Sequence, residues 1–158
     1  MDNLEQQIGE LLKQKRLTLG IVESATGGLI SHRITNISGS SAYYRGSVTS
    51  YRNDIKMKVI GVKKETLEHH GAVSPQVAEE MAQGGRKVLN ADICIADTGI
   101  AGPTGGSEEK PVGLFFIGLS YKSDTLSRKN IFAGNREQNK QMAAEAALNW
   151  LKDYLSSL

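Results

Sequence analysis

This sequence of 158 residues has one cysteine, no long apolar run and little excess of either charge. Its one cysteine, Cys94, excludes an intramolecular disulfide, and its apolar neighbours predict a buried side chain and a reducing, cytoplasmic location. No apolar run approaches the ~20 residues that cross a bilayer, and no signal segment opens the chain, so we expect no membrane partner. The formal net charge of +2 is too small to predict nucleic-acid binding.

Sequence patterns for common cofactors and metals are also missing. The two glycine-rich segments match neither the dinucleotide fingerprint G-x-G-x-x-G nor a P-loop, which argues against a P-loop ATPase. The histidines, His32, His69 and His70, do not form the helical pair of a zinc hydrolase. We therefore expect no metal and no cofactor. A Ser-His-Asp triad through His32 or His70 lacks a local signature and is disfavoured.

Alternating helical and strand patterns predict an α/β fold with a mixed sheet in three layers, α/β/α. The length and the 39% hydrophobic content suit one domain over residues 1–158. Helical spacing occurs at residues 4–15, 29–37, 54–61, 64–70, from 75 to at least 88, and 135–155. Strand patterns occur at residues 17–22, 43–51, 91–96, 112–121 and 126–132. Ligand sites of such sheets collect at strand ends.

Helix-capping residues give these elements their expected starting points. Asp2 or Asn3 is placed to cap the first helix. Ser74, followed by Pro75, has the pattern of a cap and first helical residue for the helix that begins at 75. We expect Val88 on the buried face of that same helix, because it continues the helical spacing of apolar residues.

The segment Glu-Ser-Ala-Thr-Gly-Gly, residues 23–28, lies between the first predicted strand and the second helix. Gly27 and Gly28 allow the backbone to approach a ligand, and the N–H groups that start the helix favour an anion or a developing oxyanion. Ser24 is thus a candidate nucleophile. The alternative is that Ser24 or Thr26 only caps the helix, and on this segment alone the cap is the favoured interpretation.

A second glycine-rich segment, residues 97–107, follows the predicted strand at 91–96. It forms either a wide turn or a cradle of backbone N–H groups for the phosphate of a substrate. We favour the cradle, with Thr98, Gly99, Gly102 and Gly105 as candidate binding residues.

Six motifs occur in a specific order over nearly the whole chain: residues 23–28, Gly-Ser-Ser at 39–41, a tyrosine and a lysine at 51 and 56, Gly-Ala-Val-Ser at 71–74, Thr-Gly-Ile-Ala-Gly-Pro at 98–103, and Lys-Pro-Val-Gly at 110–113. As a set they resemble the CinA C-terminal domain family, in its stand-alone form rather than fused behind a larger domain. This resemblance implies hydrolysis of the carboxamide of nicotinamide mononucleotide, which yields nicotinic acid mononucleotide and ammonia. It also implies a homo-oligomer.

The resemblance assigns roles to individual residues. Ser24 corresponds to the nucleophile of the family, Lys56 to its general base and Tyr51 to a supporting tyrosine. Thr98 and, less closely, Arg136 correspond to substrate-binding positions. The substrate-binding set expected from both lines of reasoning is Thr26, Gly27, Gly28, Thr98, Gly99, Gly102, Gly105 and Arg136. One departure is Ala25, where the family usually has cysteine, and this argues against a catalytic thiol at that position.

The predicted base must lose its proton before it can act. Lysine has a reference pKa near ~10.4, so about one in ~2,500 is neutral at pH 7, and burial or neighbouring cations must lower the pKa of Lys56. The alternative is a solvated helix residue. We expect the Tyr51 hydroxyl to orient the amine. Two other functions stay open: a non-catalytic, competence-related interaction domain, and an amidohydrolase acting on another small amide.

Overall fold

One five-stranded mixed sheet forms the centre of the molecule. The computed structural model of the chain describes residues 3–158. The strands are β1 (Leu19–Glu23), β2 (Tyr44–Thr49), β3 (Ile93–Gly99), β4 (Leu114–Tyr121) and β5 (Asp124–Ile131), in the spatial order β2-β1-β3-β4-β5. The first three are parallel, and β4 and β5 are an antiparallel hairpin beside β3. The predicted mixed sheet is therefore confirmed.

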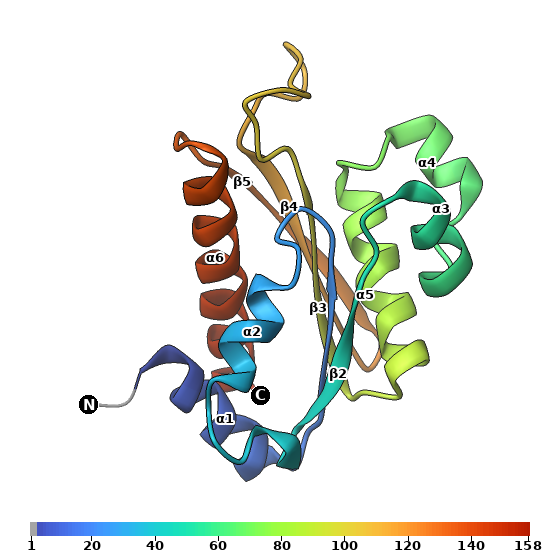
Figure 1. Ribbon diagram of the computed structural model, residues 1–158. Coiled ribbons are helices and arrows are strands. Elements are labelled where there is room, and N and C mark those ends of the chain that lie inside the picture. Colours follow the sequence, from blue (N-terminus) through green and yellow to red (C-terminus); the bar gives the residue numbers. More distant parts are fainter. Residues whose placement is uncertain (1–2) are drawn as a thin grey trace.

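Helices cover both faces of this sheet (Figure 1). On one face lie α1 (Leu4–Lys15), α2 (Leu29–Thr35) and α6 (Arg136–Ser156), and on the other lie α3 (Asn53–Ile55), α4 (Lys64–His70) and α5 (Pro75–Leu89). Two short elements complete the chain: the 3₁₀ turn η1 (Ser40–Ala42) and the π-helical turn η2 (Lys56–Ile60). This arrangement is the three-layer α/β/α architecture that the sequence predicts.

Neighbouring residues of the central strands face opposite helical layers. Ile21 of β1 and Ile95 of β3 are in the core cluster beneath α1, α2 and α6, whereas Val22 and Ala96 are in the cluster beneath α5. All four side chains are fully buried. Burial on both faces explains why these strands read as continuous apolar runs and not as alternating patterns.

Two helix caps lie where the sequence predicts them, whereas one residue predicted on a buried helix face is exposed. Asn3 caps α1 through a reciprocal capping box with Gln6, and Ser74 caps α5; Asp2 lies outside the described residues. Val88, however, is 49% exposed, so its predicted burial is wrong. In the last turn of α5 it is Leu89 that lies over the sheet, where Gly20 leaves room for its side chain.

The carboxyl ends of β1, β2 and β3 meet at one edge of the sheet, because these strands are parallel. The segments that leave this edge carry the two glycine-rich motifs. One boundary differs from the prediction: residues 97–99 belong to β3 and pair with β4, and only the residues after them form the loop. The strand continues through Asp97 because protein groups supply hydrogen bonds to its buried carboxyl.

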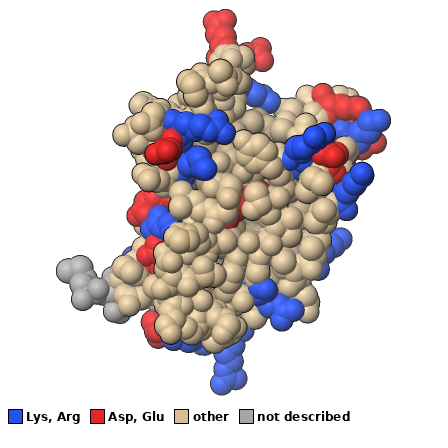
Figure 2. Space-filling view, viewed as in Figure 1, with Lys and Arg blue, Asp and Glu red and all other residues tan. Residues whose placement is uncertain are grey.

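Charged side chains of both signs are dispersed around the periphery of the face shown in Figure 2. Within residues 3–158, no helix combines the length and the apolar character that a membrane span requires. The expectations about nucleic acid and oligomeric state stay predictions.

Candidate active site

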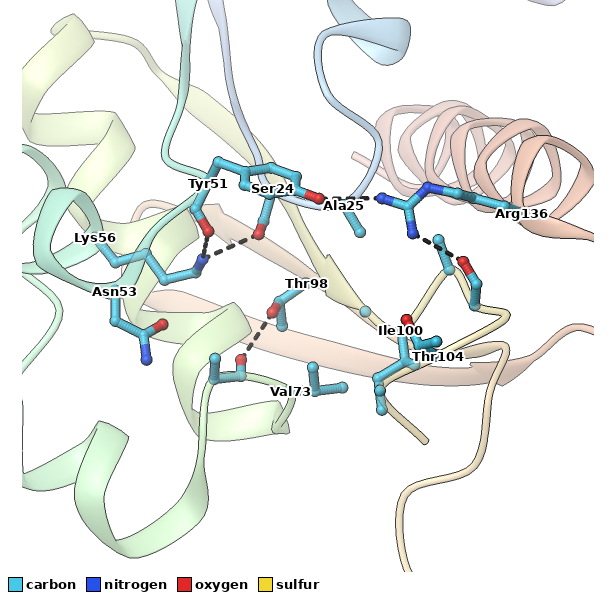
Figure 3. A pocket seen from close by; sticks show the side chains of 15 residues that line it. Ser24, Ala25, Tyr51, Asn53, Lys56, Val73, Thr98, Ile100, Thr104 and Arg136 are labelled. Carbon is cyan, nitrogen blue, oxygen red and sulfur yellow. Dashed lines mark hydrogen bonds between the residues drawn. The ribbon is translucent and has the colours of Figure 1, made fainter. Parts of the chain in front are cut away.

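A cavity of about 260 Å³ opens at the carboxyl ends of the parallel strands (Figure 3). Its walls come from the end of β3 and from the segments that follow β1, β2, β3 and β5, together with residues 72 and 73. Eight of the predicted site residues line it: Ser24, Tyr51, Lys56, Thr98, Gly99, Gly102, Gly105 and Arg136. The fold thus brings together side chains that are more than a hundred positions apart in the sequence.

Ser24 and Lys56 are hydrogen-bonded inside this cavity, with Nζ of Lys56 at 2.9 Å from Oγ of Ser24. The serine lies directly after β1, and the lysine opens the π-helical turn η2, a distortion that is frequent at functional sites. Ser24 does not cap α2, because the N-cap of that helix is Gly28 and no side chain caps it. The capping interpretation of Ser24 is therefore wrong.

Lys56 is buried, with 2% of its surface exposed, so the interpretation of a solvated lysine is also wrong. Besides Ser24, its amine contacts the backbone carbonyls of Ser50 at 2.9 Å and Tyr51 at 3.0 Å. No ion pair within residues 3–158 includes Lys56. Burial lowers the pKa of this lysine below its usual range, and the nearby charge of Asp97 opposes the shift without a direct contact.

The lowered pKa of Lys56 predicts how stability depends on pH. Between the folded and the unfolded pKa of this lysine, only the unfolded chain binds the proton, so the lysine adds about 1.4 kcal/mol of stability per pH unit as the pH rises. Denaturant unfolding of the wild type and of Lys56→Met from about pH 7 to pH 10 measures this term. We expect the difference in unfolding free energy to move in favour of the wild type as the pH increases. Parallel curves would show that the pKa is not lowered.

Tyr51 contributes to the site differently from the prediction. Its hydroxyl accepts a hydrogen bond from Nη2 of Arg136 at 3.1 Å, and its side chain is 57% exposed at the rim of the cavity. The group of Tyr51 that contacts the amine of Lys56 is its backbone carbonyl. Arg136 also donates from Nη1 to the carbonyl of Gly102 at 2.8 Å, so its guanidinium links the segments that follow β2 and β3 (Figure 3).

The second glycine-rich segment forms the opposite wall. Thr98 is buried and donates its hydroxyl to the carbonyl of Ala72 at 2.7 Å, which holds residues 71–74 against the cavity. In the intramolecular hydrogen bonds of residues 3–158, the N–H groups of Gly102, Thr104 and Gly105 do not take part. These donors are available to a ligand, and the phosphate cradle stays a prediction.

The structure does not bring Thr26, Gly27 and Gly28 into this cavity. They line a neighbouring hollow together with residues of α6. In the first turn of α2, the N–H of Leu29 donates to the carbonyl of Thr26, and those of Ile30 and Ser31 donate to the carboxylate of Glu23 at 2.9 and 3.0 Å. The expectation that this helix start binds an anion of the substrate is therefore wrong, because a side chain of the protein already occupies it.

Two residues near the site were missed by the sequence analysis. Asp97 is fully buried and accepts from the backbone N–H groups of Ser24 at 3.0 Å and Thr26 at 3.2 Å, which fixes the turn that carries Ser24. An acidic residue at the end of an apolar run was the available signal. Asn53, in the first turn of α3, also lines the cavity.

Curated relatives of this chain are longer proteins. It is 47% identical to a CinA-like protein of Chloroherpeton thalassium over 98% of its own length and 38% of that protein. It is 46% identical to a CinA-like protein of Syntrophomonas wolfei over 99% of its own length and 38% of that protein. The chain spans between 36% and 40% of the length of the curated relatives it matches.

Solved structures resemble the fold over nearly its whole extent. A CinA superfamily protein from Klebsiella pneumoniae 700603 is 28% identical, with a TM-score of 0.94 over 98% of this chain and 97% of that one. A competence/damage inducible protein from Agrobacterium tumefaciens is 36% identical, with a TM-score of 0.86 over 99% of both chains. The family model of the CinA C-terminal domain matches residues 1–155. By this match and by its relatives, the chain belongs to the CinA C-terminal domain family.

Proposed function

We propose that this chain is an amidohydrolase that converts nicotinamide mononucleotide to nicotinic acid mononucleotide and ammonia, with Ser24 as nucleophile and Lys56 as general base. The observation that carries the chemistry is the 2.9 Å contact between the Ser24 hydroxyl and the amine of a buried lysine that has no carboxylate partner among the described residues. The choice of substrate rests on the family resemblance.

The contacts of Lys56 suit a neutral amine. An uncharged amine has two N–H donors and one lone pair. The carbonyls of Ser50 and Tyr51 take the two donors, which leaves the lone pair for the hydroxyl proton of Ser24. Ser24 is thereby paired with a base in the geometry that nucleophilic catalysis requires.

In the proposed reaction, Oγ of Ser24 attacks the carboxamide carbon while its proton moves to Nζ of Lys56. The resulting ammonium gives this proton to the nitrogen of the tetrahedral intermediate, the C–N bond breaks, and ammonia leaves behind an ester on Ser24. Water then attacks the ester while Lys56 accepts its proton; the bond between the acyl carbon and Oγ of Ser24 breaks, and Lys56 gives the proton to Oγ. The products are the carboxylic acid and the free Ser24 hydroxyl.

The rim of the cavity suits the anionic end of a nucleotide. The guanidinium of Arg136 donates only to neutral oxygens, those of Gly102 and Tyr51, and forms no ion pair within residues 3–158. Arginine binds phosphate strongly through paired donors, and the N–H groups of Gly102 and Gly105 lie on the same wall. These groups favour a phosphorylated substrate over free nicotinamide.

Ammonia release from a small panel of amides tests the proposal. The panel contains nicotinamide mononucleotide, the riboside without its phosphate, free nicotinamide and glutamine. We expect turnover of the mononucleotide, and a kcat/KM for the riboside that is lower by about tenfold to a hundredfold because the contacts to phosphate are lost. If only another amide of the panel is turned over, the proposed roles of Ser24 and Lys56 stand and the proposed substrate is wrong. Without ammonia from any amide, the chain is better explained as a non-catalytic interaction domain.

A further inference from the structure

A buried hydroxyl next to the site contacts two carboxyl groups. Oγ1 of Thr26 lies 2.6 Å from Oε1 of Glu23 and 2.5 Å from Oδ1 of Asp97. Both acidic residues are fully buried, and Thr26 is 1% exposed. A hydroxyl carries one proton and can donate it to only one of two acceptors. If both carboxyls were ionised, one of these short contacts would join two oxygens with no proton between them.

The other hydrogen bonds indicate which carboxyl holds the extra proton. Glu23 also accepts from the N–H groups of Ile30 and Ser31 and from the Ser31 hydroxyl, so it has donors enough to stabilise an ionised form. Asp97 has two backbone N–H donors besides Thr26. Burial raises the pKa of Asp97 to about 6; its hydrogen bonds with Thr26 and Ser24 oppose the rise, and the charge of Glu23 adds to it. Near and below this pH the proton therefore belongs on Asp97, which donates to Thr26, which donates to Glu23.

The charged groups around this chain of oxygens come from several elements. Glu23 ends β1, and Lys56, on η2, is the base whose ammonium form a negative Asp97 favours. On the α6 side, Lys140 extends toward the backbone of Gly27. If Asp97 is neutral, the main opposition to the lowered pKa of Lys56 is removed.

We propose that Glu23 and Asp97 share one proton through the Thr26 hydroxyl, and that Asp97, while it holds this proton, does not favour the ammonium form of Lys56, so that Lys56 reaches the unprotonated form that Ser24 requires at a lower pH. The second half of this inference rests on the proposed function, whereas the shared proton does not. Asp97 is thus a positioning residue in two respects. Its carboxyl holds the backbone of Ser24 and Thr26, and its proton removes a negative charge from the vicinity of the base.

The shared proton is tested on the intact protein without any assay of activity. Aspartate labelled with ¹³C at the carboxyl carbon gives a resonance for Asp97, identified by its loss in Asp97→Asn. We expect the chemical shift of a carboxylic acid at mildly acidic pH, well above the ~3.9 at which ordinary aspartate ionises. Thr26→Ser keeps a hydroxyl and should leave the pH at which this resonance titrates unchanged, whereas Thr26→Val removes the hydroxyl through which the proton is shared and should move that pH. A fully ionised resonance in the wild type, or equal behaviour of the two Thr26 variants, would overturn the proposal.

The effect on the base is read from the pH dependence of kcat/KM for nicotinamide mononucleotide. Asp97→Asn places an uncharged group where we infer an uncharged acid, so the acid limb of the profile should stay at its wild-type position even if turnover falls. If Asp97 is ionised in the active protein, this substitution removes an anion, the pKa of Lys56 falls, and the limb moves to lower pH. That movement would refute the role of Asp97. A wild type that releases no ammonia would refute the proposed function and leave the NMR result standing.

Discussion

Ser24→Ala is expected to reduce ammonia release by roughly 10⁴-fold or more, the order of effect found when a catalytic nucleophile is removed. The Ser24 hydroxyl forms its hydrogen bond with Lys56, whereas the bond that holds the turn comes from the backbone N–H of Ser24 to Asp97 and survives the substitution. The loss of one hydroxyl contact should therefore cost only about 1 kcal/mol of stability. Turnover and thermal unfolding of the purified variant measure both effects.

Ser120→Ala is the matched control for this variant. Ser120 is a fully buried serine on β4 whose hydroxyl contacts Arg86 and Thr125, and it does not line the cavity. Its replacement should lower stability by a similar amount and leave turnover near the wild-type value. If Ser24→Ala releases ammonia as fast as this control, Ser24 is not the nucleophile and the proposed mechanism is wrong.

Lys56→Arg is expected to reduce turnover by at least the ~10² that general-base catalysis supplies. Arginine keeps the positive charge but does not release a proton near neutral pH, so it can replace a lysine that binds phosphate and cannot replace a base. Binding of nicotinamide mononucleotide should stay within roughly tenfold, or about 1.4 kcal/mol, of the wild type. Single-turnover kinetics and equilibrium binding separate the two effects.

The burial of Lys56 requires a check on folding, because a guanidinium is larger than an amine and the side chain is 2% exposed. Thermal unfolding of the same preparation shows whether the variant folds. Lys58 is exposed and lies two residues further along the same π-helical turn. Lys58→Arg is therefore the matched control, which should change neither turnover nor thermal unfolding. Substantial turnover by Lys56→Arg would mean that the lysine is only an electrostatic contact and that the proton of Ser24 goes elsewhere.

The order of helices and strands could be predicted from apolar spacing alone, and with it the mixed sheet in three layers. This succeeded because a helix with one buried stripe and a strand buried on both faces leave different local patterns. Element ends were less certain. The glycine-rich composition of residues 97–107 predicts a loop that begins at Asp97, yet hydrogen bonds from residues 24 and 26 allow β3 to continue through residue 99. Such partners lie more than 70 positions away and leave no mark near Asp97.

The residue types of the candidate site were visible in the sequence through the ordered motifs of the family. The hydrogen-bond partners of these residues could not be read from the sequence. The Tyr51 hydroxyl was expected on Lys56, but its backbone carbonyl holds the amine while the hydroxyl accepts from Arg136. A tyrosine five positions before a lysine permits either arrangement, and only the path of the chain after β2 selects one.

The sequence by itself determined which chemical groups are present: a serine after the first strand, a lysine after the second, and an acidic residue where the third apolar run ends. Only the tertiary structure decided what these groups can do. A lysine becomes a base when it is removed from water and held by neutral acceptors, and Lys56 reaches that state through contacts with Ser24, Ser50 and Tyr51 on two strand ends. Burial and distance belong to the packed sheet, so the protonation state of this site follows from the fold and not from any local motif.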